Sequence, residues 1–146
     1  MIHLVLDAST AIDWFVLSDE GEAYARRLAR LAASGQVSFS VPLHFDIEVA
    51  GHLVKKHRRL PRQFDSAWLQ DALSVLDVLR IDIVGQGINF NMLGKLAASY
   101  ALTPYDVPYF HLARMMGVPI ASRDCGIIAA CKNWNVLHWT PAFSAV

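Results

Sequence analysis

The sequence predicts an α/β domain in which a central parallel sheet lies between two layers of helices, a three-layer α/β/α arrangement. Short apolar runs typical of buried strands alternate along the chain with longer segments of helical periodicity, and two of the runs end on an aspartate. Such alternation indicates βαβ units, which require parallel strands. The 146 residues, 54% hydrophobic and 18% charged, suit one well-packed core, so we expect a single domain spanning 1–146.

The strands are predicted from apolar runs bounded by turn residues. Residues 2–6 are rich in Val, Leu and Ile, which favours a strand buried on both faces. Residues 37–41 and 79–84 alternate with the period of two that is typical of strands. A short run over 118–121 precedes Ser-Arg-Asp, and 136–138 is expected to form the last strand.

The helices are predicted from apolar residues at helical spacing, with Gly, Pro and acidic residues at their ends. We expect helices over 22–34 (with an acidic start at 18–22), 43–57, 61–78, 88–102, 105–114 and 126–131. Ala23, Leu28 and Leu31 are the expected core residues of the first helix. Ile47 and Val49 are among those of the second.

The charge balance and the cysteines limit the class of protein. Lys and Arg number 13, as do Asp and Glu, so no net field attracts nucleic acid and any such binding depends on how the charges are distributed. Cys125 and Cys131 fall on different faces of a predicted helix, which favours reduced thiols over a disulfide. The sequence contains neither a signal-peptide pattern nor an apolar stretch of membrane-helix length. We therefore expect a cytoplasmic protein without membrane association.

Four acidic residues fall where a parallel sheet would bring them together. Asp7 and Asp124 follow predicted strands, and Glu48 and Asp106 lie near the starts of predicted helices. Strand C-termini and the N-termini of the following helices share one edge of such a sheet, so all four are expected at the same rim. Clustered carboxylates repel one another unless a cation neutralises them. An all-oxygen ligand set predicts Mg²⁺ or Mn²⁺ rather than Zn²⁺.

Structural roles explain several of these residues equally well. Asp7 is also placed to cap a helix that starts at Ala8, and Glu48 is also typical of a solvated helix surface. Ser9 and Ser122 stand next to the strand-end acids, where a hydroxyl can support a carboxylate or simply form a turn. A basic run, Lys55, Lys56, Arg58, Arg59 and Arg62, suits either phosphate binding or a helix C-terminus.

Four segments in order carry a family resemblance. They are Leu4-Val5-Leu6-Asp7-Ala8-Ser9, Pro42 with Glu48 six residues later, Tyr105-Asp106-Val107-Pro108-Tyr109-Phe110-His111-Leu112-Ala113, and Ala121-Ser122-Arg123-Asp124. Together they resemble the motifs of PIN-domain proteins over essentially the whole chain. The short single-domain length is most similar to the VapC toxins of bacterial type II toxin–antitoxin pairs.

The resemblance implies an endoribonuclease that depends on Mg²⁺ or Mn²⁺. The family's metal-binding acids map onto Asp7, Glu48, Asp106 and Asp124, and its hydroxyls onto Ser9 and Ser122. It also implies a homodimer and a small antitoxin that lies across the site and needs an apolar groove. Trp14, Phe15 and Trp68 are candidates for that groove, although core packing is the commoner use of such residues. RNA contact is expected from the basic run and from Arg123.

The sequence departs from the family pattern at three positions. Ser122 replaces the more usual Thr, Pro108 stands where Ala is usual, and Asp13 adds an acid whose approach to the site the sequence leaves open.

Two other functions remain possible interpretations of the sequence. A Mg²⁺-dependent phosphatase would use Asp7 as its nucleophile, but it usually has a second Asp two residues later, where this chain has Ser9. A degenerate module would bind RNA or a partner without catalysis.

Overall fold

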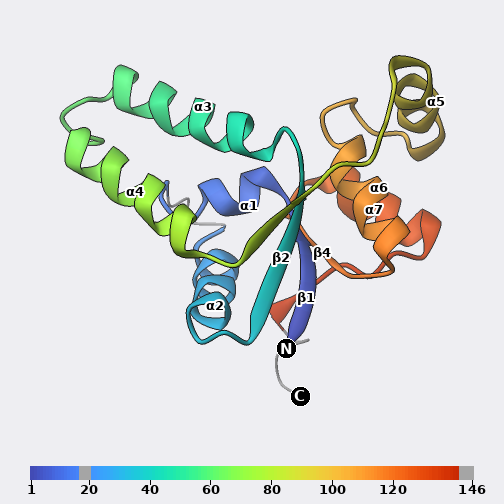
Figure 1. The fold of residues 1–146 in the computed structure, drawn as a ribbon, viewed down its shortest axis with the longest axis horizontal. Helices are drawn as coiled ribbons and strands as arrows, with labels where there is room; N and C mark the ends of the chain where they lie inside the picture. The colour runs from blue at the N-terminus through green and yellow to red at the C-terminus, as the bar shows by residue number, and fades with distance from the viewer. Residues whose placement is uncertain (17–20, 142–146) are drawn as a thin grey trace.

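The sheet is built from four parallel strands in the order β3-β2-β1-β4 (Figure 1). The structure is a computed structural model that describes residues 1–16 and 21–141. The strands are β1 Ile2–Leu6, β2 Val37–Pro42, β3 Ile81–Val84 and β4 Ile120–Ala121. The parallel α/β architecture predicted from the alternating pattern is therefore confirmed.

Helices cover both sides of this sheet. The described residues form α1 Ala8–Ile12, α2 Glu22–Ala33, α3 Phe45–Arg59, α4 Ser66–Val78, α5 Phe90–Tyr100, α6 Val107–Met116 and α7 Cys125–Trp134. In Figure 1, α1 to α4 lie on one side of the strands and α5 to α7 on the other. The expected acidic residues Asp19 and Glu20 lie outside the described residues.

The core is centred on β1, which is paired on both edges. Leu4, Val5 and Leu6 are completely buried, as the uninterrupted apolar run predicts for a strand covered on both faces. Phe110 of α6 and Trp139 join the same cluster of buried side chains. Because β1 is fixed from both sides, the residue that follows it has a well-defined position at the sheet edge.

Apart from shifts of two or three residues at the ends of other elements, four details differ from the sequence prediction. The helix expected from residue 61 begins at Ser66, because the carboxylate of Asp65 accepts the Trp68 backbone N–H at 2.8 Å and caps it. The strand expected over 136–138 is a single bridge between Ile120 and His138. Ala23 is exposed, and its place in the core is taken by the neighbouring Ala25. Ile47 is 78% exposed rather than buried.

Two further observations concern the cysteines and the membrane. Cys125 and Cys131 are both free, and burial raises the pKa of the Cys131 thiol to about 11. Within residues 1–16 and 21–141, none of the helices combines the length and the hydrophobicity that crossing a bilayer requires.

Candidate active site

The four predicted acids line one hollow at the C-terminal edge of the sheet. Asp7 directly follows β1 and Asp124 lies three residues beyond β4, while Glu48 lies in the first turn of α3 and Asp106 occupies the position directly before α6. The hollow has a volume of about 280 Å³, and its lining includes all four carboxylates. Four segments distant in sequence therefore meet around one acidic pocket, which is completed by Ala8, Ser9, Ile12, Asp13 and His52.

Asp7 is the most buried of these acids. Only 4% of its surface is exposed, and the hydroxyls of Ser9 and Ser122 each donate a hydrogen bond of 2.7 Å to the same oxygen, Oδ2. Burial raises the pKa of Asp7 to about 6, against the effect of the two hydroxyls and with a contribution from the negative charges of Asp106 and Glu48. Its side chain makes no capping hydrogen bond to α1, so helix capping does not account for it.

Glu48 is oriented by a tyrosine from another helix. The phenol of Tyr109, which is completely buried in α6, donates a hydrogen bond of 2.9 Å to Glu48 Oε2. Burial and the neighbouring Glu48 charge raise the pKa of Tyr109 well above its ordinary value, so it remains a proton donor at any physiological pH. Glu48 is thus a held side chain and not a freely solvated one.

Asp106 and Asp124 are each fixed by a local hydrogen bond. The hydroxyl of Thr103 donates to Asp106 Oδ2 at 2.9 Å, and burial, followed by the charges of Asp124 and Glu48, raises the Asp106 pKa despite that hydroxyl. Asp124 Oδ2 accepts the backbone N–H of Ile127 at 2.9 Å and so caps α7. The Asp124 backbone N–H in turn donates to Ser122 Oγ at 3.0 Å, which links this acid to the hydroxyl that binds Asp7.

The chemistry of the pocket fits a hydrated hard cation. All four candidate ligands present carboxylate oxygens, the donors that Mg²⁺ and Mn²⁺ prefer. Within the described part of the chain, no three His, Cys, Asp or Glu side chains are grouped closely enough to hold one ion as they stand. Mg²⁺ usually takes only one or two carboxylates and keeps several waters, for which a hollow of this volume has space.

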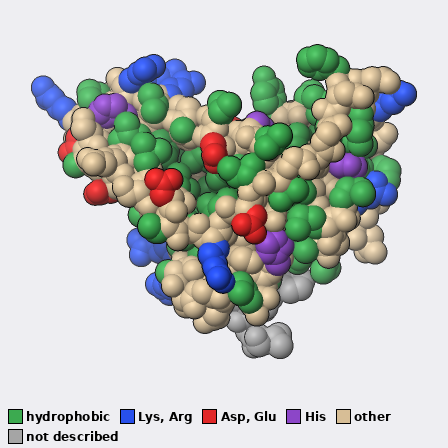
Figure 2. All heavy atoms as spheres, viewed as in Figure 1, with side chains coloured by type: hydrophobic (Ala, Val, Ile, Leu, Met, Phe, Trp, Pro, Cys, Tyr) green, Lys and Arg blue, Asp and Glu red, His purple; other side chains and the backbone are tan. Residues whose placement is uncertain are grey.

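The basic run lies away from the acidic pocket. Lys55, Lys56, Arg58 and Arg59 are exposed in the last turns of α3, and the exposed Arg62 follows the helix. Glu48 and Arg59 are separated by about 16 Å along the helix axis, from the rise per residue. Basic side chains gather at that end of α3 in Figure 2. Arg123, for which the sequence predicts RNA contact, donates to Asp13 Oδ2 at 2.7 Å.

Sequence reasoning missed one residue of the pocket lining, His52, and two residues that hold its acids, Thr103 and Tyr109. His52 follows Glu48 by four residues, a spacing that puts two side chains on one helix face and that could have identified it. Thr103 precedes Asp106 by three, which is a recognisable local capping distance. Tyr109 is 61 residues from Glu48, and no local signal indicates that contact.

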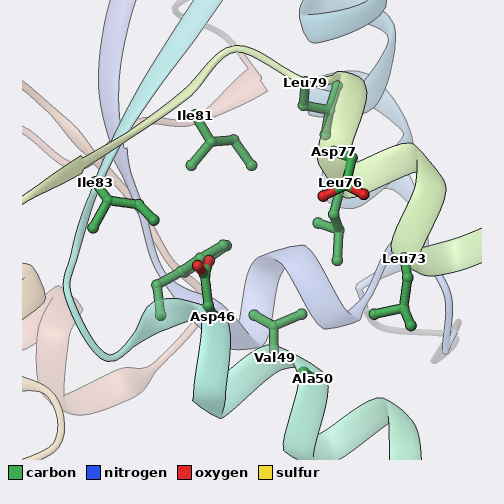
Figure 3. A pocket seen from close by; sticks show the side chains of 10 residues that line it. Asp46, Val49, Ala50, Leu73, Leu76, Asp77, Leu79, Ile81 and Ile83 are labelled. Carbon is green, nitrogen blue, oxygen red and sulfur yellow. The ribbon is translucent and has the colours of Figure 1, made fainter.

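A second hollow lies on the other side of α3. It has a volume of about 490 Å³ and is lined by residues of α3, α4 and β3 and of the segment between α4 and β3. Figure 3 shows its side chains, which are largely apolar except for two carboxylates: Phe45, Asp46, Val49, Ala50, Leu73, Leu76, Asp77, Leu79, Ile81 and Ile83. We call this hollow the α3–α4 groove. Trp14, Phe15 and Trp68, which were candidates for such a groove, pack against the core.

Comparisons with known proteins identify the fold class. No protein-family model and no curated protein matches the sequence. Two solved structures are similar over most of their length, and the chain has the PIN-like fold that its motifs predict. One is PAE2754 from Pyrobaculum aerophilum, with a TM-score of 0.60 and 16% identity, covering 88% of this chain and 84% of that one. The other is VapBC2 from Rickettsia felis bound to a DNA fragment from their promoter, with a TM-score of 0.62 and 13% identity, covering 95% and 98%.

Proposed function

We propose that this protein is a metal-dependent endoribonuclease, the toxin component of a VapBC-like pair. The observation that carries the proposal is the convergence of Asp7, Glu48, Asp106 and Asp124 on one pocket at the sheet edge. Folding alone does not favour this arrangement, because burial of Asp7 beside other acids raises its pKa to about 6 and therefore opposes its ionisation. A divalent cation reverses that cost.

The acids divide the work of binding and proton transfer. Asp7, Asp106 and Asp124, with Glu48, would hold hydrated Mg²⁺ or Mn²⁺, some of them through its waters, and the cation would neutralise the phosphodiester and lower the pKa of an attacking water. Ser9 and Ser122 fix the Asp7 carboxylate by binding one of its oxygens. Tyr109 occupies Glu48 Oε2, so Glu48 Oε1 is the oxygen available to accept a proton from water.

The basic run supplies the contact with the RNA backbone. Its five exposed side chains, Lys55, Lys56, Arg58, Arg59 and Arg62, lie at the opposite end of α3 from Glu48. A strand that is cut at the acidic pocket could follow α3 and place its flanking phosphates against these cations. Binding of this kind is sensitive to salt, because each neutralised phosphate releases counterions.

We propose that the α3–α4 groove receives the protein partner. It offers an apolar surface with Asp46 and Asp77 in its lining, which suits a segment carrying large apolar side chains and a Lys or Arg. The similar VapBC2 structure is itself a complex bound to promoter DNA, which supports an antitoxin as that partner. A homodimer is also part of the proposal, and light scattering of the purified protein tests it.

The test is cleavage of total RNA with Mg²⁺, with and without a chelator. We expect cleavage that the chelator abolishes, and a loss of about 100-fold or more in Asp106→Asn, which retains the acceptor for Thr103 but removes the charge. Cleavage that persists in both cases contradicts the proposal. Trapping of an acyl phosphate on Asp7 would indicate the phosphatase instead, and calorimetry without any divalent binding would indicate a non-catalytic module.

A further inference from the structure

Arg123 connects three segments beside the acidic pocket. It stands between Ser122, which binds Asp7, and Asp124, which lines the pocket. Its guanidinium makes a double contact with Asp13 at the end of α1, with Nε at 2.7 Å and Nη2 at 2.6 Å from Asp13 Oδ2. The Arg123 side chain is only 30% exposed and the Asp13 side chain only 13%, so the pair is largely shielded from solvent.

Gly21 at the start of α2 provides the space for this guanidinium. A Cβ added to Gly21 would lie 2.5 Å from both Cζ and Nη2 of Arg123 and 2.7 Å from Nε. The backbone of Gly21 has φ −96°, which any residue can adopt, so close approach and not conformation requires the glycine here. The space beside Gly21 and the carboxylate of Asp13 together fix the direction of the Arg123 side chain.

The pair also changes the electrostatics of the pocket. Asp13 is a fifth carboxylate in the lining, beside four that already repel one another. Arg123 compensates its charge through a planar fork, for which the single ammonium of lysine is a poor substitute. Asp13 is therefore neutralised within the chain, whereas the four other carboxylates of the pocket are left to a bound cation.

From this geometry we propose that Arg123 is a positioning residue. By binding Asp13 while its guanidinium packs against Gly21, it acts as a clamp that holds the 122–124 segment so that Ser122 supports Asp7 and Asp124 faces a bound divalent cation. The inference rests on the proposed function in so far as that cation is concerned. Arg123 then acts through its neighbours and does not contact RNA, which revises the role expected from the sequence.

Gly21→Ala tests the clamp without removing any charge. The added methyl group must displace the guanidinium, so we expect Mn²⁺ binding measured by calorimetry in the absence of RNA to weaken about tenfold, as is typical when a residue that supports metal ligands is lost. Gly94→Ala in α5 is the matched control, because its Cβ would meet nothing within 4 Å. We expect that variant to bind Mn²⁺ like the wild type.

Substitutions of Asp13 and Arg123 distinguish the effect of the guanidinium geometry from that of its positive charge alone. We expect Arg123→Gln and Arg123→Lys both to weaken Mn²⁺ binding, because neither side chain retains the fork. The double variant Asp13→Asn/Arg123→Gln should be no weaker than Arg123→Gln alone, since both changes remove the same contact. Full rescue by Arg123→Lys, or wild-type Mn²⁺ binding in Gly21→Ala, would overturn the proposal.

A metal-free readout keeps this inference distinct from the proposed function. Amide NMR shifts of Asp124 and Ile127, which report the cap on α7, should move in Gly21→Ala and not in Gly94→Ala. If the wild type binds no Mn²⁺ but these shifts move, the proposed function fails while the clamp stands. If the shifts are unchanged, the clamp is wrong whether or not the protein cleaves RNA.

Discussion

Two sides of the same helix face hollows of opposite character. Glu48 and His52, one turn apart on α3, line the acidic pocket together with carboxylates from three other segments. Phe45 and Val49, also one turn apart, line the α3–α4 groove, where most of the surface is apolar. Figure 2 shows hydrophobic side chains gathered in the hollow between α3 and α4, with acidic side chains beside it. One helix therefore separates a site suited to chemistry from one suited to recognition.

The difference lies in what each hollow lacks. The acidic pocket concentrates negative charge around a buried carboxylate, and a cation is what stabilises such a group. The groove leaves apolar surface in contact with water, and removing that surface from water is what a partner segment would accomplish. Substitutions on the two sides of α3 should accordingly have separable effects.

The largest effect is expected from a pair of acids two residues apart on α3. Glu48→Gln should reduce RNA cleavage by about 100-fold, because it removes the negative charge of the carboxylate that Tyr109 holds in the pocket by a hydrogen bond. Asp46→Asn should leave cleavage close to that of the wild type, since Asp46 lines the groove instead. Single-turnover rates at saturating Mg²⁺ provide the measurement. Equal losses in the two variants would mean that the two hollows do not act separately.

The pocket was more predictable than the groove, for a physical reason. Strand-end acids such as Asp7 and Asp124 are recognisable because parallel strands place their C-termini at one edge. Ile47 could not be placed in the same way, because apolar residues occur on three sides of α3 and the sequence does not indicate which side faces the core. The groove also depends on where α4 begins, which the Asp65 cap determines.

Contacts between side chains were the least predictable part of the site. Tyr109 reaches Glu48 across 61 residues, and Arg123 reaches Asp13 across 110. Each depends on how helices pack after the sheet has formed, and neither spacing carries a periodic signal. The sequence therefore predicts which acids meet and that the nearby hydroxyls of Ser9 and Ser122 can support them, but not the distant neighbours that orient or neutralise them.

The next effect concerns the cost of the pocket to folding. Because the folded-state pKa of Asp7, about 6, exceeds its ordinary value of 3.8, ionisation destabilises the folded protein as pH rises through this interval. In chelator, Asp7→Asn should therefore raise the free energy of unfolding at about pH 8 by about 2–3 kcal/mol. The gain should disappear below about pH 3, where Asp7 is neutral in both the folded and the unfolded protein. Urea denaturation across this range measures it.

A control defines how specific that gain is to the pocket. Asp71→Asn changes an exposed carboxylate on α4 and should leave the unfolding free energy within about 0.5 kcal/mol of the wild type. Added Mg²⁺ should stabilise the wild type more than Asp7→Asn, since ligand binding to the folded state adds to its stability. A gain in Asp7→Asn that does not vary with pH would contradict the electrostatic explanation.

A smaller effect is expected in the groove. Asp77→Lys reverses one of its two charges and should weaken binding of a cationic, apolar partner segment by about tenfold, with cleavage of RNA unaffected. The partner to be used is a synthetic segment that carries large apolar side chains and a Lys or Arg, titrated by calorimetry. Asp71→Asn, on the same helix but outside the groove lining, serves as the control. Unchanged affinity in Asp77→Lys would place the partner elsewhere on the surface.

An effect of the same size is expected from the residue that joins α6 to the acidic side of α3. Tyr109→Phe removes the hydroxyl that binds Glu48 Oε2 but retains the buried ring, which packs edge-on against His44 at 4.9 Å between centroids. Loss of one hydrogen bond to a charged group corresponds to about 1.5 kcal/mol or somewhat more, so cleavage should fall about tenfold, less than in Glu48→Gln. Combining the two changes should add little to Glu48→Gln alone, because the tyrosine acts through that carboxylate. Additive losses would show instead that Tyr109 has a role of its own in the pocket.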